Sequence, residues 1–139
     1  MKDHQLGIQI AQSLSRNTSV VAAYAVGSFV QGNARTESDF DLAVVVENRN
    51  VVSQYSIYDV LKGIQFPKNL DLSLVDRASS PLFLFQVISK GERIYERTRG
   101  EVVQFEAFVL HNYYDSAHIR TIYNGYLKQK FSHVPYANR

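Results

Sequence analysis

The chain of 139 residues is 45% hydrophobic and 20% charged, which is enough apolar material for one core, so we expect a single globular domain over residues 1–139. It contains no cysteine, which excludes a disulfide framework, a thiolate zinc site and a cysteine nucleophile. Its formal net charge is only +2 and its basic residues are scattered, which argues against a nucleic acid as the main substrate.

The first two predicted elements are a helix and a strand. Residues 4 to 16 carry apolar side chains such as Leu6 and Ile10 at helical spacing, which predicts a short amphipathic helix. Residues 20 to 26 are β-branched, aromatic or alanine and end at Gly27, which predicts a strand that leads into a turn. The chain has neither a signal-like start nor a run of about eighteen apolar residues, so we expect a cytoplasmic protein with no membrane partner.

The turn after this strand opens the most informative motif of the chain. Gly27 and Ser28 are followed by ten residues rich in turn formers and then by Asp39 and Asp41, which flank a phenylalanine. Strand character resumes over residues 42 to 46. Because side chains alternate across a strand, the two aspartates are predicted to point toward the same spot.

This arrangement indicates a particular chemistry. Two neighbouring carboxylates repel each other unless a cation lies between them, and Mg²⁺ typically takes one or two protein carboxylates together with water and substrate phosphates. Ser28 follows a glycine at a strand end, where a hydroxyl and backbone N–H groups can approach phosphate oxygens. Either half of the motif alone is usually structural, but both in this order are typical of metal-dependent nucleotidyl transfer from a nucleoside triphosphate.

The next predicted elements are a helix over residues 51 to 62, which Gly63 ends, and a strand over residues 70 to 75. Alternation along this strand places Asp71 opposite its clearly apolar side. Asp76 lies beyond the strand, where we expect a turn or a cap. Asp71 is therefore the better candidate for a site residue.

A further helix and a short strand are predicted before the C-terminal region. Serines at 79 and 80 followed by Pro81 favour a helix start, and Gly91 is the predicted end of that helix. Residues 92 to 95 are short and strand-like. They connect to the last element of the chain.

Thr98 and Glu101 have the spacing of a capping box, which predicts a long helix from there to about Phe131. Its aromatic side chains fall on more than one face, and we expect most of them to pack on the sheet. A helix that is apolar on several faces can instead serve a partner, which makes it the favoured docking element. A stacking platform for single-stranded nucleic acid is a third hypothesis, disfavoured because no basic groove accompanies the aromatic residues.

Three stretches of the sequence resemble the minimal nucleotidyltransferases, or MNT domains, of the DNA polymerase β superfamily: GSFVQGNARTESDFDLAVVVE, NLDLSLVD and ISKGERIYER. The resemblance covers roughly residues 20 to 131. It implies an α+β, polymerase-β-like nucleotidyltransferase fold with a small mixed sheet flanked by helices and a long C-terminal helix. Several members of this family are antitoxins paired with HEPN ribonuclease toxins, and some transfer AMP from ATP to tyrosine hydroxyls of the toxin.

The resemblance also implies roles for individual residues. Asp39 and Asp41 correspond to the Mg²⁺ ligands and catalytic carboxylates of the family. Asp71 corresponds to the third carboxylate, which serves as a metal ligand and as the general base for the attacking hydroxyl. Gly27 and Ser28 correspond to the residues that bind the phosphates of ATP.

One position departs from the family pattern. Many relatives carry an arginine where this chain has Gln31. If that arginine normally contacts phosphate, Arg35 in the same loop is the available substitute for nucleotide binding. An ordinary solvated loop cation is the equally weighted alternative for Arg35.

These observations predict a protein adenylyltransferase that acts as an antitoxin by Mg²⁺-dependent AMP transfer from ATP to a HEPN-family toxin. Two alternatives stay open. The first is a non-catalytic antitoxin that neutralises its toxin by complex formation alone. The second is a small-molecule nucleotidyltransferase of the aminoglycoside-modifying type, although little chain is left to build an acceptor pocket.

Overall fold

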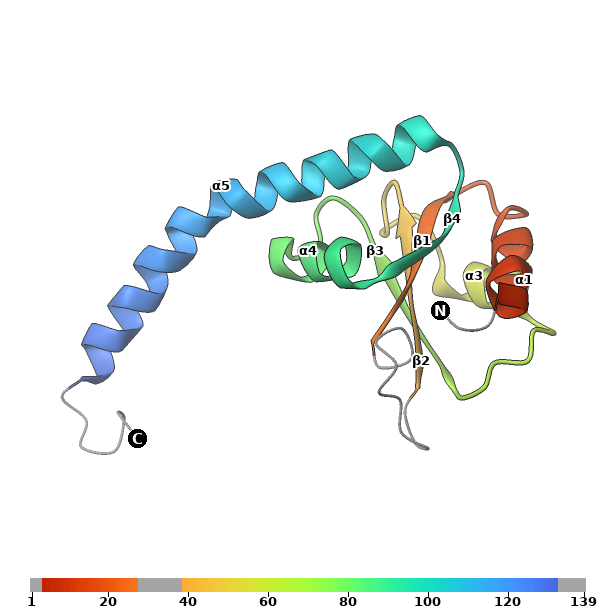
Figure 1. Ribbon diagram of the computed structural model, residues 1–139, viewed down its shortest axis with the longest axis horizontal. Helices are drawn as coiled ribbons and strands as arrows, with labels where there is room; N and C mark the ends of the chain where they lie inside the picture. The colour runs from red at the N-terminus through yellow and green to blue at the C-terminus, as the bar shows by residue number, and fades with distance from the viewer. Residues whose placement is uncertain (1–3, 28–38, 133–139) are drawn as a thin grey trace.

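The computed structural model describes residues 4–27 and 39–132. Within these ranges the chain forms four helices and four strands, as an α+β fold requires (Figure 1). In chain order they are α1 (His4–Leu14), β1 (Val20–Val26), β2 (Phe40–Val46), α3 (Gln54–Leu61), β3 (Leu70–Val75), α4 (Pro81–Lys90), β4 (Glu92–Glu96) and α5 (Arg99–Phe131). None of the helices described is long and apolar enough to cross a membrane.

The four strands form one mixed sheet in the order β3-β2-β1-β4. Strand β1 pairs antiparallel with β2 and with β4, whereas β2 and β3 are parallel. The parallel register places Asp41 directly opposite Asp71, and the antiparallel register places Asp41 opposite Val26. The small mixed sheet flanked by helices is therefore confirmed, and its register decides which carboxylates meet.

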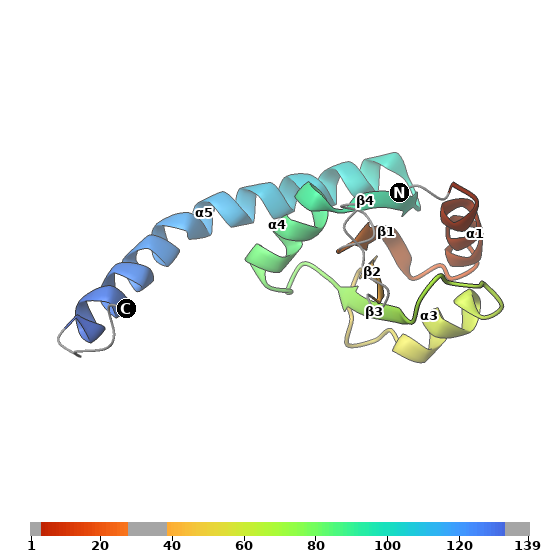
Figure 2. The same cartoon turned by 60° about the horizontal axis from the view of Figure 1, so that its bottom comes forward.

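Helices cover both faces of the sheet, with α1 and α3 on one face and α4 and α5 on the other (Figures 1 and 2). Along β2, Phe40, Leu42 and Val44 belong to the core under α1 and α3, whereas Ala43 and Val45 belong to the core under α4 and α5. Asp41 follows the same alternation and points to the α4 and α5 side.

The helix ends follow local capping chemistry. Helix α4 begins after Ser80, whose hydroxyl accepts the backbone N–H of Phe83, and ends at Gly91, as predicted. Helix α3 begins at Gln54 rather than at residue 51. The difference arises because the Ser53 hydroxyl caps the helix by accepting the N–H of Tyr55.

The long helix α5 begins after the predicted capping box but packs differently from our expectation. Only Val102, Phe105 and Val109 of this helix are buried. The far half leaves the body of the molecule and turns downward (Figure 1), and its aromatic side chains are 47% to 60% exposed at Tyr123, Tyr126 and Phe131. The expectation that most of its aromatic residues pack on the sheet is wrong, because the sheet is shorter than the helix.

Candidate active site

Asp41 and Asp71 lie side by side at the end of the sheet where β1 ends and β2 and β3 begin, and Asp39 is near enough for its charge to act on Asp41. Asp39 lies exposed just before β2, Asp41 is the second residue of β2, and Asp71 is the second residue of β3. Asp41 and Asp71 occupy paired positions of neighbouring parallel strands, so their side chains project from the same face of the sheet. The structure thus brings Asp41 and Asp71 together, whereas Asp39 does not complete a group of three metal-binding carboxylates with them.

Asp41 is the central and least exposed group of the three. Its burial raises its pKa above the ordinary aspartate value, and the negative charge of Asp71, a hydrogen bond with Asp71 and the charge of Asp39 raise the pKa further. Each cause disfavours the ionised form of the Asp41 carboxyl. A cation between Asp41 and Asp71 would remove this cost.

The Asp41 carboxylate leaves no room for a side chain at position 27. The φ angle of Gly27 is +82°, in the left-handed region that favours glycine. A Cβ at this position would overlap Oδ2 of Asp41. The turn predicted at Gly27 is therefore observed, and the glycine has a second role that the sequence did not reveal, because it leaves space for the carboxylate of the neighbouring strand.

The remaining predicted nucleotide-binding residues, Ser28 and Arg35, lie outside the described residues, as does Gln31. Their proposed contacts with phosphate stay predictions.

The described residues offer two carboxylates for a metal ion rather than a closed metal cage. No group of three or more His, Cys, Asp or Glu side chains in residues 4–27 and 39–132 is arranged to hold a metal ion. The pair that fits is Asp41 and Asp71, which face each other across the parallel strands β2 and β3. Mg²⁺ accepts such an open site, because one or two carboxylates hold it while water and substrate phosphates fill its other positions.

Asp76 takes the structural role predicted for it. It is 5% exposed, and its carboxylate accepts the backbone N–H groups of Ala78 and Arg49, each at 2.9 Å. Its own N–H donates to the Ser79 hydroxyl at 3.1 Å. The carboxylate is thus used to fix the turn after β3.

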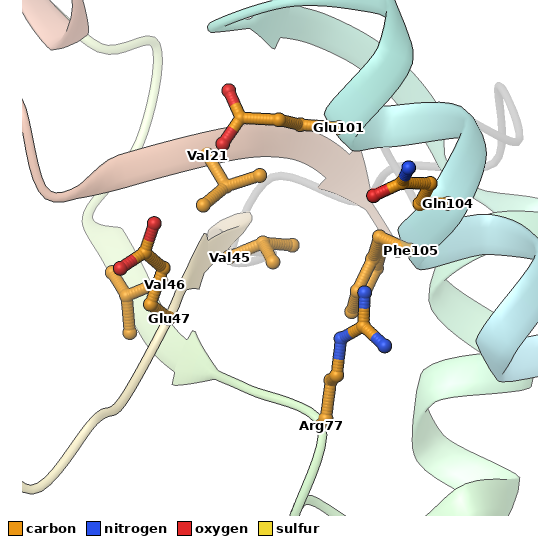
Figure 3. A pocket seen from close by; sticks show the side chains of 8 residues that line it. All are labelled: Val21, Val45, Val46, Glu47, Arg77, Glu101, Gln104 and Phe105. Atoms are coloured by element: carbon orange, nitrogen blue, oxygen red, sulfur yellow. The ribbon is translucent and has the colours of Figure 1, made fainter.

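A cavity of about 270 Å³ lies at the opposite end of the sheet, between β2 and the start of α5 (Figure 3). Two carboxylates line it, Glu47 and Glu101, and both are bound by Arg97. The Arg97 guanidinium also donates to the carbonyl of Thr18 at 2.6 Å. Glu47 and Glu101 are thus ion-paired with Arg97, and we call these three residues the Arg97 clasp. The sequence analysis missed it because Glu47 is far from the other two residues in the chain.

Comparisons with known proteins agree with this architecture. A family profile described as "Polymerase beta, Nucleotidyltransferase" matches residues 8–100. Comparison with curated protein sequences finds no match.

Solved structures similar to the chain include a crystal structure of a toxin–antitoxin with AMP-PNP, with a TM-score of 0.63 at 18% identity over 87% of this chain and 98% of that one. A second is a tri-AMPylated Shewanella oneidensis HEPN toxin in complex with MNT antitoxin, with a TM-score of 0.60 at 17% identity over 88% of this chain and 96% of that one. A third is the toxin–antitoxin MntA-HepT, with a TM-score of 0.59 at 15% identity over 90% of this chain and 99% of that one. At these identities the similarity establishes the fold.

Proposed function

The chain belongs to the polymerase β nucleotidyltransferase family, and from this premise we propose that it is an antitoxin that transfers AMP from ATP to a tyrosine hydroxyl of a HEPN-family toxin. The observation that carries the proposal is the convergence of Asp41 and Asp71, with Gly27 shaped to leave room for the Asp41 carboxylate. The toxin and ATP are proposed because similar folds occur in a complex with a tri-AMPylated HEPN toxin and in a toxin–antitoxin structure with AMP-PNP.

In the proposed reaction the acceptor hydroxyl attacks the α-phosphorus of ATP, a new P–O bond forms, and the bond to the bridging oxygen breaks so that pyrophosphate leaves. A tyrosine hydroxyl has a pKa near 10, so at neutral pH it needs a base. Asp71 is the proposed acceptor of this proton, because it is exposed and lies at the strand end beside Asp41.

Asp39, Asp41 and Asp71 are the proposed Mg²⁺ ligands, and the paired positions of Asp41 and Asp71 support this proposal for those two. When bound, Mg²⁺ would neutralise the charge of the triphosphate and favour departure of pyrophosphate. Gly27 and Ser28 are the proposed contacts of the phosphates.

Arg35 is the proposed phosphate-binding cation in place of the family arginine. We propose that Arg35 binds phosphate in addition to Gly27 and Ser28, so that a substitution of Arg35 alone tests its contribution to ATP binding.

The cavity beside Glu47 and Glu101 does not favour a small-molecule acceptor. It lies at the end of the sheet away from Asp41, and its carboxylates are occupied by Arg97. A protein acceptor that supplies its own hydroxyl to an open site fits the exposed carboxylates Asp39 and Asp71 better.

The test uses the HEPN-family toxin itself, which we expect to be an all-helical protein with an Arg-x₄-His motif that a neighbouring open reading frame encodes. It is incubated with ATP, Mg²⁺ and this chain, and its intact mass is measured. We expect successive AMP additions with the wild type and with Asp59→Asn, an exposed carboxylate on the far side of the sheet. Asp41→Asn and Asp39→Asn should form the complex but add no AMP. A complex without any mass increase for the wild type would reject the transfer reaction and leave masking of the toxin as the function.

A further inference from the structure

The far end of α5, residues 119–131, forms an arm without support from the rest of the described chain. The last ring contact between α5 and α4 is made by Tyr113 and Tyr114 on Phe85, where the Tyr113 and Phe85 rings stack with centroids 4.0 Å apart. From Ala117 to Phe131 the hydrogen bonds and ring contacts stay within α5, as between Thr121 and Ala117. The arm therefore projects as an isolated helix (Figure 1).

One face of the arm is apolar. Ile119, Ile122, Tyr123 and Tyr126 follow the spacing i, i+3, i+4 and i+7, which places them along a single stripe of the helix. Their side chains are between 56% and 68% exposed. An isolated helix this short is marginal in water, so a surface that covers the stripe would stabilise both the helix and its apolar side chains.

The charge of the arm indicates the chemistry of the surface that covers it. From Ser116 to Ser132 the sequence contains three basic side chains, Arg120, Lys128 and Lys130, and no acidic one. Lys130 lies beside the stripe, with its ammonium group 5.8 Å from the centre of the Tyr126 ring. A partner surface complementary to the arm is therefore apolar where it meets the stripe and carries acidic side chains at its edge.

The direction of the arm relates it to the candidate active site. Helix α5 first runs along the sheet and then bends, so that its far end lies level with the end of the sheet that carries Asp41 and Asp71 (Figure 1). A protein seated under α4, between the arm and this end of the sheet, would touch both.

We propose that the apolar stripe of the arm is the docking surface for the protein substrate, which meets it with an apolar helical surface edged by acidic side chains. This inference rests on the proposed function, because the same substrate must present a hydroxyl at the carboxylate end of the sheet. The arm holds the substrate, and the carboxylates act on it.

The area of the stripe argues against a second copy of this chain as the occupant. Four side chains of this size offer roughly 400 to 500 Å² to a partner. A stable interface needs about 800 Å² on each side. A partner that also contacts the active-site end reaches such an area, whereas two arms alone do not.

The test compares two variants that add the same charge to different faces of the arm. Ile122→Asp places a carboxylate in the stripe, and Asn124→Asp places it on the opposite face of the same helical turn. Calorimetric titration measures the affinity of the full chain for the HEPN-family toxin used in the test above, and intact mass follows the addition of AMP to that toxin. We expect Ile122→Asp to weaken binding at least about tenfold and to slow AMP addition at low substrate concentration, while Asn124→Asp behaves like the wild type.

The readouts separate the docking inference from the proposed function. If Ile122→Asp binds the protein substrate more weakly than the wild type does, but the wild type adds no AMP, the docking surface is supported and the transfer reaction is rejected. AMP addition and affinity that are the same for Ile122→Asp and the wild type would overturn the docking surface while the transfer reaction stands. Sedimentation of the chain alone tests the other occupant, since a dimer that Ile122→Asp dissociates and Asn124→Asp does not would also overturn the proposal.

Discussion

At the scale of single residues, Asp41 lies in an environment that disfavours its ionised form. Its carboxylate is partly buried and faces Asp71, so its pKa is raised in the folded state. Below the ordinary aspartate pKa of 3.8 the group is neutral in both states and costs nothing, and as the pH rises the unfolded state loses this proton more readily, so the free energy of unfolding falls.

We therefore predict that Asp41→Asn is more stable than the wild type at pH 7 without divalent cations, by roughly 0.5 to 1 kcal/mol, because it removes a like-charge pair on neighbouring strands. Urea unfolding measures the difference. Mg²⁺ should stabilise the wild type and leave Asp41→Asn unchanged, with Asp59→Asn as the charge-matched control. Equal stability of all three proteins at every Mg²⁺ concentration would contradict the cation site.

Gly27 and Gly63 offer a matched pair of substitutions. Both have positive φ angles, +82° and +94°, but a Cβ at Gly27 would overlap Asp41 whereas a Cβ at Gly63 has nothing within 4 Å. Gly63→Ala should cost only the backbone strain, about 1 to 2 kcal/mol, and Gly27→Ala should cost about 2 to 4 kcal/mol. Urea unfolding compares the stabilities, and calorimetry with Mg²⁺ and a non-hydrolysable ATP analogue should show lost binding for Gly27→Ala alone. Identical costs at both positions would mean that the Asp41 side chain can move away.

Sequence patterns identified Asp39, Asp41 and Asp71 as candidates because alternation along one strand is a local property. They also separated Asp71 from Asp76, because a strand end is visible in the sequence. The parallel register that sets Asp41 against Asp71 depends on a crossover between two strands, and no local pattern encodes it. The contact between Gly27 and the Asp41 side chain was hidden for the same reason.

At the scale of elements, the boundaries of strands with a uniform composition and the start of α4 after its serine cap were predictable, whereas the start of α3 was not, because the sequence analysis overlooked the Ser53 cap. Strands β1 and β3 have the predicted limits, and α4 lies between Ser80 and Gly91 as expected. The packing of α5 was not predictable. Aromatic side chains tend to be buried, but the sequence does not show whether they pack in the core of the same chain or against a partner.

Arg97 joins three elements at the end of the sheet away from the candidate active site. It pairs with Glu47 after β2 and with Glu101 in the first turn of α5, and it follows β4 directly. The hydrogen bonds of Arg97, and then that of Thr98, lower the pKa of Glu101 to about 2. A carboxylate with a depressed pKa stabilises the fold above its ordinary value of 4.5 and loses this contribution as the pH falls toward 2.

We predict that Arg97→Met lowers the melting temperature at pH 7 and that its difference from the wild type shrinks between about pH 5 and pH 2, as Glu101 becomes protonated. Thermal unfolding at a series of pH values measures this. The control is Arg99→Met: the Arg99 side chain is 68% exposed, and loss of its ion pair with Glu96 at 3.1 Å should matter by less than about 0.5 kcal/mol. A difference for Arg97→Met that does not change with pH would assign its effect to packing rather than to the ion pairs.

At the scale of the whole molecule, three regions have separate tasks. One end of the sheet carries the carboxylates, the other end is closed by the Arg97 clasp, and the arm projects from the body (Figure 1). The core is formed under α1 and α3 on one face and under α4 and the first part of α5 on the other. Stability of the body and recognition of a partner therefore depend on different parts of α5.

This separation predicts the result of shortening the chain after His118. The buried residues of α5 are Val102, Phe105 and Val109, and the stacked ring of Tyr113 also precedes the cut, so the core keeps its contacts. We expect the free energy of unfolding and the affinity for Mg²⁺ and an ATP analogue to stay within about 0.5 kcal/mol of the full-length values, while the far-ultraviolet helical signal falls. Binding of the protein substrate should weaken at least as much as in Ile122→Asp. A large loss of stability would show that the arm folds back on the body in solution and is not free to receive a partner.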